Sequence, residues 1–199
     1  TSAACARAWI LPIPYEATTC YGKGTRKGPA AIIKASRYAE LYDREFDCDA
    51  ALRYGVHTMA PLVSRRSGPQ ETVRRIESAV AKILGGAPAP KVLGVLGGEH
   101  SISGGVVRGL ARSAGTRNLV AVHIDAHGDL RDEYQGSRFS HACAARRIAE
   151  VCPMFQIGVR SISGDEERFR LSSRRITTVF AEEANASKPV FLKKLASFV

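Results

Sequence analysis

The feature that most constrains this 199-residue chain is the stretch at residues 120–129, which reads V-A-V-H-I-D-A-H-G-D. It begins within an apolar, β-branched run at 119–124, a pattern typical of a buried strand in a parallel sheet. Asp125, His127 and Asp129 then follow at every second position, so in extended chain their side chains share one face. The pattern predicts two carboxylates and an imidazole at the carboxyl end of a strand, where open α/β sheets bind ligands.

A second stretch repeats this arrangement upstream. A short apolar run at 92–96 is followed by G-G-E-H-S at 97–101. If the two strands are neighbours, His100 lies beside Asp125 and completes a set of two histidines and two aspartates. Mixed imidazole and carboxylate ligation suits a divalent metal such as Mn, Co, Ni or Zn. Bridging carboxylates also allow two ions about 3.5–4 Å apart to share a hydroxide.

The composition is that of an ordinary globular chain. With 45% hydrophobic and 24% charged residues, it fits a single domain spanning residues 1–199. No apolar run reaches the roughly 18 residues of a membrane span, and the first residues resemble a strand more than a signal peptide. We therefore expect no membrane partner. The five cysteines form no C-x-x-C pair, so we expect reduced thiols and a cytoplasmic location.

The net charge of +10, with an isoelectric point near 9.7, raises nucleic-acid binding as one hypothesis. The basic residues are scattered, however, and lack interleaved aromatic residues. They include four arginine pairs, namely Arg65–Arg66, Arg74–Arg75, Arg146–Arg147 and Arg174–Arg175. This distribution favours a solvated basic surface, and we expect no nucleic-acid partner.

Strand and helix patterns alternate along the chain, which predicts a three-layer α/β/α sandwich on a mainly parallel sheet. The clearest helix begins at Pro69 and is ended by Gly85 and Gly86. The strand at 92–96, a helix near 102–113 and the strand at 119–124 should form one right-handed βαβ crossover. Further strands are expected at 10–13, 52–56, 154–159 and 176–180, and further helices at 30–41, 140–151, 165–171 and 188–199.

The chain stops inside its last helical pattern. No capping signal and no further strand follow residues 188–199. Because a parallel sheet of this kind usually includes more strands, we expect the sequence to be truncated at its C-terminus.

The motifs resemble those of the ureohydrolase family, the group of arginases and agmatinases. The main matches are G-G-E-H-S at 97–101, H-I-D-A-H-G-D-L-R-D-E-Y at 123–134 and S-H-A at 140–142. Supporting matches are P-Y-E-A-T at 14–18, G-P-A-A-I at 28–32, Y-D-R-E at 42–45 and Q-I-G-V-R-S at 156–161. The sequences of these motifs are most similar to those of bacterial and archaeal agmatinases, and the resemblance covers nearly the whole chain.

The resemblance implies an arginase-like fold and an activity, the hydrolysis of agmatine to putrescine and urea with a pair of manganese ions. By resemblance, four of the six metal ligands are His100, Asp125, His127 and Asp129. The other two belong to an S-x-D-x-D motif on a later strand, which these residues do not contain. The later carboxylate by which the family binds the guanidinium is also not among them, so no substrate-binding residue is assigned.

The resemblance further implies a role for each side chain. A guanidinium carbon is a poor electrophile, so the implied attacking group is a metal-bridging hydroxide. Asp125 would bridge both ions, with His100 on one and His127 on the other. Asp129 would ligate a metal, orient the hydroxide and accept its proton. His141 would protonate the leaving amine, because the ordinary pKa of histidine lies near working pH.

Three neighbouring residues have simpler interpretations. His123 lies within the predicted buried strand itself, before the turn that carries the ligands, and we interpret it as a core or supporting histidine rather than a ligand. Glu99 either hydrogen-bonds a ligand or faces solvent. Gly128 stands where relatives often carry threonine, and we expect that change to be tolerated.

Hypotheses from three classes follow. The leading one is a binuclear-manganese amidinohydrolase of the agmatinase type, with guanidinobutyrase, arginase and formimidoylglutamase as alternatives within the class. The second is a truncated or degenerate ureohydrolase-like protein with an incomplete metal site and little or no catalysis. The third is the nucleic-acid-binding domain considered above. The resemblance also implies a homo-oligomer, either a trimer or a hexamer.

Overall fold

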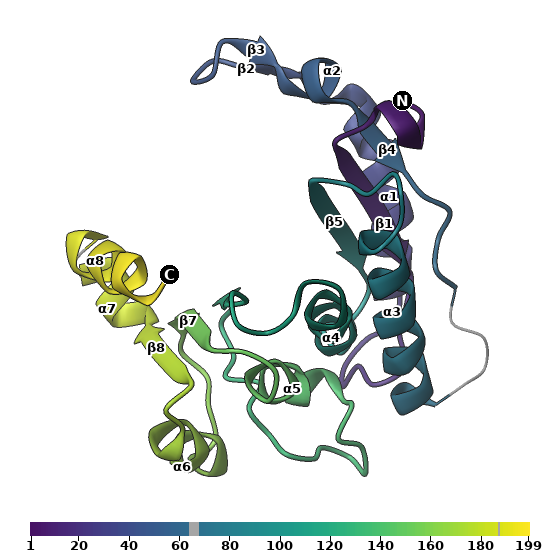
Figure 1. Cartoon of the computed structure of the whole chain (residues 1–199). Helices are drawn as coiled ribbons and strands as arrows, with labels where there is room; N and C mark the ends of the chain where they lie inside the picture. The colour runs from purple at the N-terminus through teal and green to yellow at the C-terminus, as the bar shows by residue number, and fades with distance from the viewer. Residues whose placement is uncertain (64–67, 187) are drawn as a thin grey trace.

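The computed structural model describes residues 1–63, 68–186 and 188–199. Its strands form two three-stranded parallel sheets and one short antiparallel hairpin (Figure 1). Helices connect successive strands of the sheets, which confirms the predicted α/β class with parallel sheets.

The first sheet has β1 (Ala8–Ile13) at its centre, with β4 (Val56–Thr58) on one side and β5 (Val92–Gly97) on the other. Helices α3 (Pro69–Leu84) and α4 (Ile102–Ala114) pack tightly against each other beside this sheet. Their contact needs small residues, since a Cβ on Gly109 of α4 would lie 2.6 Å from Val80 Cβ of α3. Leu11, Ile13, Ile76, Val80 and Ile102 form the core that joins these elements.

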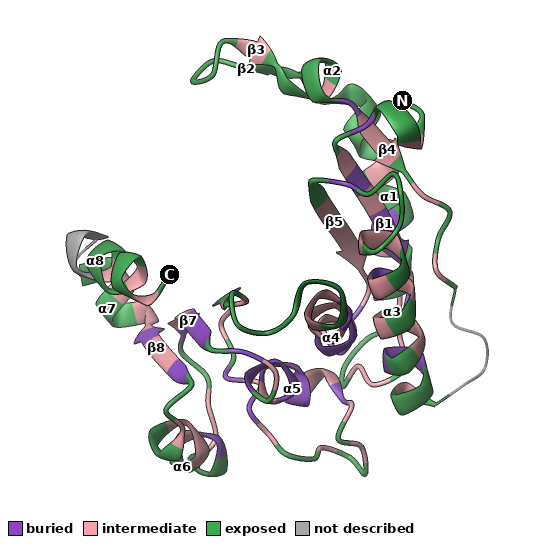
Figure 2. Ribbon diagram, viewed as in Figure 1, coloured by how far each residue is buried: buried purple, intermediate pink, exposed green. Residues whose placement is uncertain are grey.

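The second sheet has β7 (Met154–Val159) at its centre, between β6 (Ala121–Ile124) and β8 (Ile176–Phe180). The strands at 154–159 and 176–180 begin and end where the sequence predicts. Their apolar side chains join α5 (Ala144–Ala149) in a second core. Figure 2 shows that α5 is largely buried.

The two sheets are separate, which corrects the expected crossover between the strands at 92–96 and 119–124. β5 and β6 do not pair, and among the described residues no strand lies against the outer edge of either. A groove of about 570 Å³ lies between them, lined by β5, α4 and β6. Val122 and Ile124 of β6 are 45% and 78% exposed. Helix α4 therefore leads from one sheet to the other.

The N-terminal third differs most from the sequence prediction. Helix α1 (Gly28–Ala35) is shorter than the expected helix at 30–41, and Ile32 of its predicted apolar face is 51% exposed. A hairpin of β2 (Tyr42–Asp43) and β3 (Cys48–Asp49) follows. Helix α2 (Ala50–Tyr54) occupies most of the segment expected to be a strand at 52–56. Tyr54 and its neighbours are mostly exposed, so little apolar periodicity marks this region.

The C-terminal segment is helical where expected and also contains one helix that was missed. Helix α6 (Gly164–Ser172) follows β7, and its start is stabilised by a capping box between Ser163 and Glu166. Helix α7 (Ala181–Ala186), which was not predicted, precedes α8 (Lys188–Phe198). None of the helices in the described part of the chain is long and apolar enough to cross a membrane.

One arginine pair departs from the predicted solvated surface. Arg147 is only 3% exposed, and its Nη2 atom lies 2.7 Å from Asp132 Oδ1. The guanidinium of Arg146 lies 3.3 Å from the centre of the Phe169 ring. This pair therefore stabilises the packing around α5. Arg65–Arg66 lie outside the described residues.

Candidate metal centre

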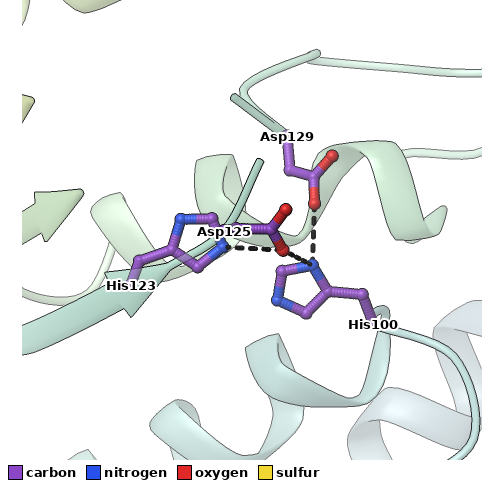
Figure 3. A group of neighbouring side chains, drawn as sticks. All are labelled: His100, His123, Asp125 and Asp129. Carbon is purple, nitrogen blue, oxygen red and sulfur yellow. Dashed lines mark hydrogen bonds and ion pairs between the residues drawn. The ribbon is translucent and has the colours of Figure 1, made fainter. Parts of the chain in front are cut away.

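The turn after β5 positions the first histidine of the site. The amide of Gly98 donates to Ile13 O (3.2 Å), and that of Glu99 donates to Tyr15 O (3.0 Å), which fixes the turn against the end of β1. A Cβ on Gly98 would lie 2.1 Å from Tyr15 O, so the approach requires glycine. His100 follows directly and projects toward the second sheet (Figure 3).

Glu99 anchors this turn, which decides between the two interpretations offered by the sequence. Its carboxylate is buried and accepts hydrogen bonds from the amides of Ala17 (2.6 Å) and Thr18 (2.7 Å). The hydroxyls of Thr18 (2.7 Å) and Ser101 (2.6 Å) donate to the other oxygen. Burial alone would raise the pKa of Glu99, but these hydrogen bonds outweigh it and hold the pKa below its ordinary value. Glu99 thus joins the segment at 14–18 to the turn.

The turn after β6 positions the aspartates. The amide of Asp125 donates to Ile157 O (3.1 Å) and that of Gly128 to Ser161 O (3.0 Å), so the turn follows the end of β7. Asp129 adopts a φ of 48°, a left-handed conformation that non-glycine residues rarely adopt. The chain has therefore left the extended conformation at Asp129, so alternation alone does not place this side chain.

Four side chains converge at the ends of the two strands. One ligand atom from each of His100, His123, Asp125 and Asp129 lies within 4.8 Å of the other three (Figure 3). His100 Nδ1 lies 2.7 Å from Asp129 Oδ2 and 3.7 Å from Asp125 Oδ2. His123 Nε2 also lies 3.7 Å from Asp125 Oδ2. The structure thus brings together three of the four predicted ligands without the predicted pairing of the strands.

His127 lies apart from this group. Its side chain is 64% exposed, and its Nδ1 atom is 3.3 Å from Asp125 Oδ1, the other carboxylate oxygen. The His127 amide donates to the same oxygen (2.9 Å). His123, for which a core or supporting role was predicted, is only 8% exposed and lies at the inner side of the group. The role of His127 as a ligand remains a prediction.

The charges in this group are mutually stabilising. Burial opposes protonation of His100, but its hydrogen bond to Asp129 and the charge of Asp125 raise its pKa above the ordinary value. Burial works against ionisation of Asp125, yet the amide of His127 and the two nearby histidines lower its pKa. Burial, together with the charge of His100, lowers the pKa of His123. The surroundings therefore favour the ionised form of Asp125.

The donor set fits a divalent cation. Two carboxylates and at least one imidazole suit a borderline-hard metal such as manganese, and suit zinc as well. His123 Nε2 is buried and has no hydrogen-bond partner among the described residues, and Asp125 Oδ2 lies 3.7 Å from it. The residues thus fit a metal, without selecting one element.

The centre opens into a cavity of about 630 Å³ that also holds His141. The amide of His141 donates to Thr18 Oγ1 (3.0 Å), so the 14–18 segment positions this histidine as well. Its Nε2 atom lies 3.4 Å from Cys20 Sγ, and its ring meets Tyr134 edge-on at 5.9 Å between centroids. The sequence analysis did not identify Cys20 or Tyr134 as site residues. Tyr134 lies within a matched motif, whereas no local pattern marks Cys20.

The fold and the site define an α/β protein with a histidine–carboxylate centre at the carboxyl ends of its strands. The family model described as the arginase family matches residues 6–199. The chain therefore belongs to the arginase family, as the sequence motifs indicated.

Individual relatives agree with this assignment. The chain is 37% identical to an N(1)-aminopropylagmatine ureohydrolase of Synechocystis, over 92% of this chain and 60% of the relative. It is also 37% identical to an agmatinase of Pyrococcus horikoshii, over 88% of this chain and 59% of the relative. The crystal structure of the agmatine ureohydrolase of Thermoplasma volcanium shares the fold, with a TM-score of 0.83 and 24% identity over all of this chain and 65% of that one. The chain thus spans about 60% of the length of these curated relatives.

Proposed function

We propose that the protein of which these residues form at least a part hydrolyses a linear guanidino compound, releasing urea and an amine, as agmatinases do. The observation that carries this proposal is the convergence of His100, Asp125 and Asp129 in a cavity that also holds His141. The names of the relatives support agmatine or N(1)-aminopropylagmatine as the substrate. The homo-oligomeric state and cytoplasmic location implied by the resemblance belong to the same proposal.

We assign the metal site to a pair of manganese ions, in line with the family resemblance. His100, His127, Asp125 and Asp129 would supply four of its ligands. When bound, such ions lower the pKa of water by several units and so supply hydroxide near neutral pH. Asp125 has one oxygen directed toward His100 and the other toward His127, which suits a bridging role.

The remaining chemistry belongs to side chains of this chain. Asp129 would accept the proton that the attacking hydroxyl group gives up as it joins the guanidinium carbon. The bond from this carbon to the substituted nitrogen then breaks, and the nitrogen leaves as an amine once it gains a proton. His141 lies on the cavity wall, held by Thr18, where it can deliver that proton.

The complete site needs more negative charge than these residues supply. Asp125 and Asp129 are the two carboxylates in the convergent group of the described chain, whereas two dications close together repel strongly unless anionic ligands lie between them. The groove between β5 and β6, with its exposed Val122 and Ile124, is open to further polypeptide beside the site. We therefore expect the 199-residue chain alone to be poorly active.

A second candidate is a ureohydrolase-like protein with an incomplete metal site and little catalysis. Two features favour this candidate for the isolated chain: the side chain of His127 is exposed, and β5 and β6 each have one edge without a paired strand among the described residues. The two candidates differ in what the full-length protein does.

Urea release distinguishes these candidates. Full-length protein loaded with Mn²⁺ should release urea from agmatine or N(1)-aminopropylagmatine, and less from arginine or guanidinobutyrate. The Asp125→Asn variant should lose this activity by several orders of magnitude, because a bridging ligand is gone. Absence of urea from all four compounds, with metal bound, would refute the proposed activity and favour the second candidate.

A further inference from the structure

His123 belongs to a row of polar side chains that crosses the second sheet. On adjacent parallel strands, His123 of β6 pairs in register with Gln156 of β7, which pairs with Thr178 of β8. Gln156 is fully buried, and His123 is only 8% exposed. Polar groups in such a position are expected to be hydrogen-bonded to one another, and they are.

The hydrogen bonds of Gln156 fix the orientation of its amide. Its Nε2 atom donates to Gly128 O (2.9 Å) and lies 3.1 Å from His123 Nδ1, while its Oε1 atom accepts from the Thr178 hydroxyl (3.1 Å). The amide group has two hydrogens, and both are used. The opposite orientation would place Oε1 against Gly128 O, with two acceptors facing each other. Gln156 therefore donates to His123 Nδ1.

This donation determines where the proton of the His123 ring lies. Because Nδ1 accepts a hydrogen bond, the neutral ring carries its hydrogen on Nε2. That atom has no hydrogen-bond partner among the described residues, and Asp125 Oδ2 lies 3.7 Å from it. The His123 ring is also stacked on that of His100, with 5.1 Å between centroids and 11° between planes. At 3.7 Å these two atoms are too far apart for a hydrogen bond, so the bond forms only if Asp125 Oδ2 moves closer.

We propose that His123 is a positioning residue that donates its Nε2–H to Asp125 and orients this carboxylate for metal binding. The observed hydrogen bonds run from Thr178 through Gln156 to His123, and the proposed one extends them to Asp125. The inference rests on the proposed metal site in one respect, namely that Asp125 is a ligand.

Direct ligation by His123 is the competing arrangement. It needs a lone pair on Nε2, and therefore a hydrogen on Nδ1. Gln156 would then have to present an oxygen to Nδ1, and Gly128 O would lose its donor. The observed hydrogen bonds thus favour a supporting histidine, a kind of contact that commonly tunes metal affinity by 10- to 100-fold.

The tautomer can be measured without metal and without a variant. Two-bond ¹H–¹⁵N correlation NMR on the metal-free chain should show His123 protonated at Nε2 and unprotonated at Nδ1. The Gln156→Glu variant, whose carboxylate accepts rather than donates, should shift the proton to Nδ1. A wild-type His123 protonated at Nδ1 would overturn the proposal, whether or not the protein proves to be a ureohydrolase.

Metal affinity provides the second readout. His123→Leu should weaken Mn²⁺ binding, measured by electron paramagnetic resonance, by 10- to 100-fold, and His123→Gln, which retains an N–H donor, should recover most of it. The matched control is His57→Leu, because His57 on β4 packs edge-on against Trp9 far from the centre along the sheet. A folded His123→Leu chain with unchanged affinity would also overturn the proposal.

Discussion

His100 Nδ1 and Asp129 Oδ2 lie 2.7 Å apart, although the two residues follow strands of different sheets. Their contact is made by two turns, one held against the end of β1 and the other against the end of β7. The centre therefore forms without direct pairing of β5 and β6. Its geometry depends on the residues that hold these turns, which are the most informative positions to change.

Glu99→Gln should destabilise the chain at neutral pH. The glutamine oxygen can still accept from the amides of Ala17 and Thr18, but its NH2 group would replace the oxygen to which the hydroxyls of Thr18 and Ser101 donate. With the charge also lost, we expect a loss of about 2–3 kcal/mol in the free energy of unfolding. The pKa of Glu99 is lowered in the folded state, so its contribution is present above the unfolded value of about 4.3 and is lost as pH falls through the folded pKa.

Urea titrations between pH 7 and pH 3 measure this effect. The difference between wild type and Glu99→Gln should be largest at pH 7 and should shrink as the pH falls below about 4. Glu133→Gln, at an exposed position, serves as the control and should change little. A difference that grows toward acid pH would contradict the assigned role of Glu99.

Gly98→Ala should disrupt the site more than the same substitution at a glycine where an added Cβ meets no close neighbour. The new Cβ would lie 2.1 Å from a backbone oxygen, that of Tyr15, so the turn carrying His100 must move. We expect a loss of about 1–3 kcal/mol in stability and weaker metal binding. Gly28→Ala is the matched control, since its nearest neighbour is 3.6 Å away. Equal thermal midpoints and metal affinities for the two variants would be inconsistent with this packing.

Arg147→Met should destabilise the region around α5. Its buried guanidinium lies 2.7 Å from Asp132 and 3.0 Å from Glu150, and we expect a cost of about 1–3 kcal/mol, as for other hydrogen-bonded groups. Arg174→Met, in the exposed pair, should be nearly neutral. Chemical denaturation of both variants checks the difference, and a neutral Arg147→Met would restore the interpretation of this pair as surface charge.

The sequence predicts the parallel strands well because their apolar runs are bounded by turn residues, as at 154–159 and 176–180. It also predicts that His100, Asp125 and Asp129 lie close together, as they do in the structure, while their role as metal ligands stays a prediction. His123 was not predicted as a ligand because it lies within the strand, although it is two residues before Asp125 and alternation puts both side chains on one face. Its register with Gln156 is a long-range property that the sequence alone does not give.

The separate sheets could not be predicted for a related reason. The apolar runs at 92–96 and 119–124 indicate two strands and a helix between them, but local patterns do not say which strands are neighbours. The hairpin of β2 and β3 has too few buried residues to leave a periodic signal. In both cases the structure depends on contacts between distant segments.

Metal binding at Asp125 tests the central claim most directly. Titration of the 199-residue chain with Mn²⁺, monitored by electron paramagnetic resonance, should show at least one bound ion. Asp125→Asn should weaken its binding at least tenfold, whereas Asp165→Asn, on exposed α6, should not. Binding of manganese with equal affinity by all three chains, or no binding by the wild type, would contradict the assignment of this centre.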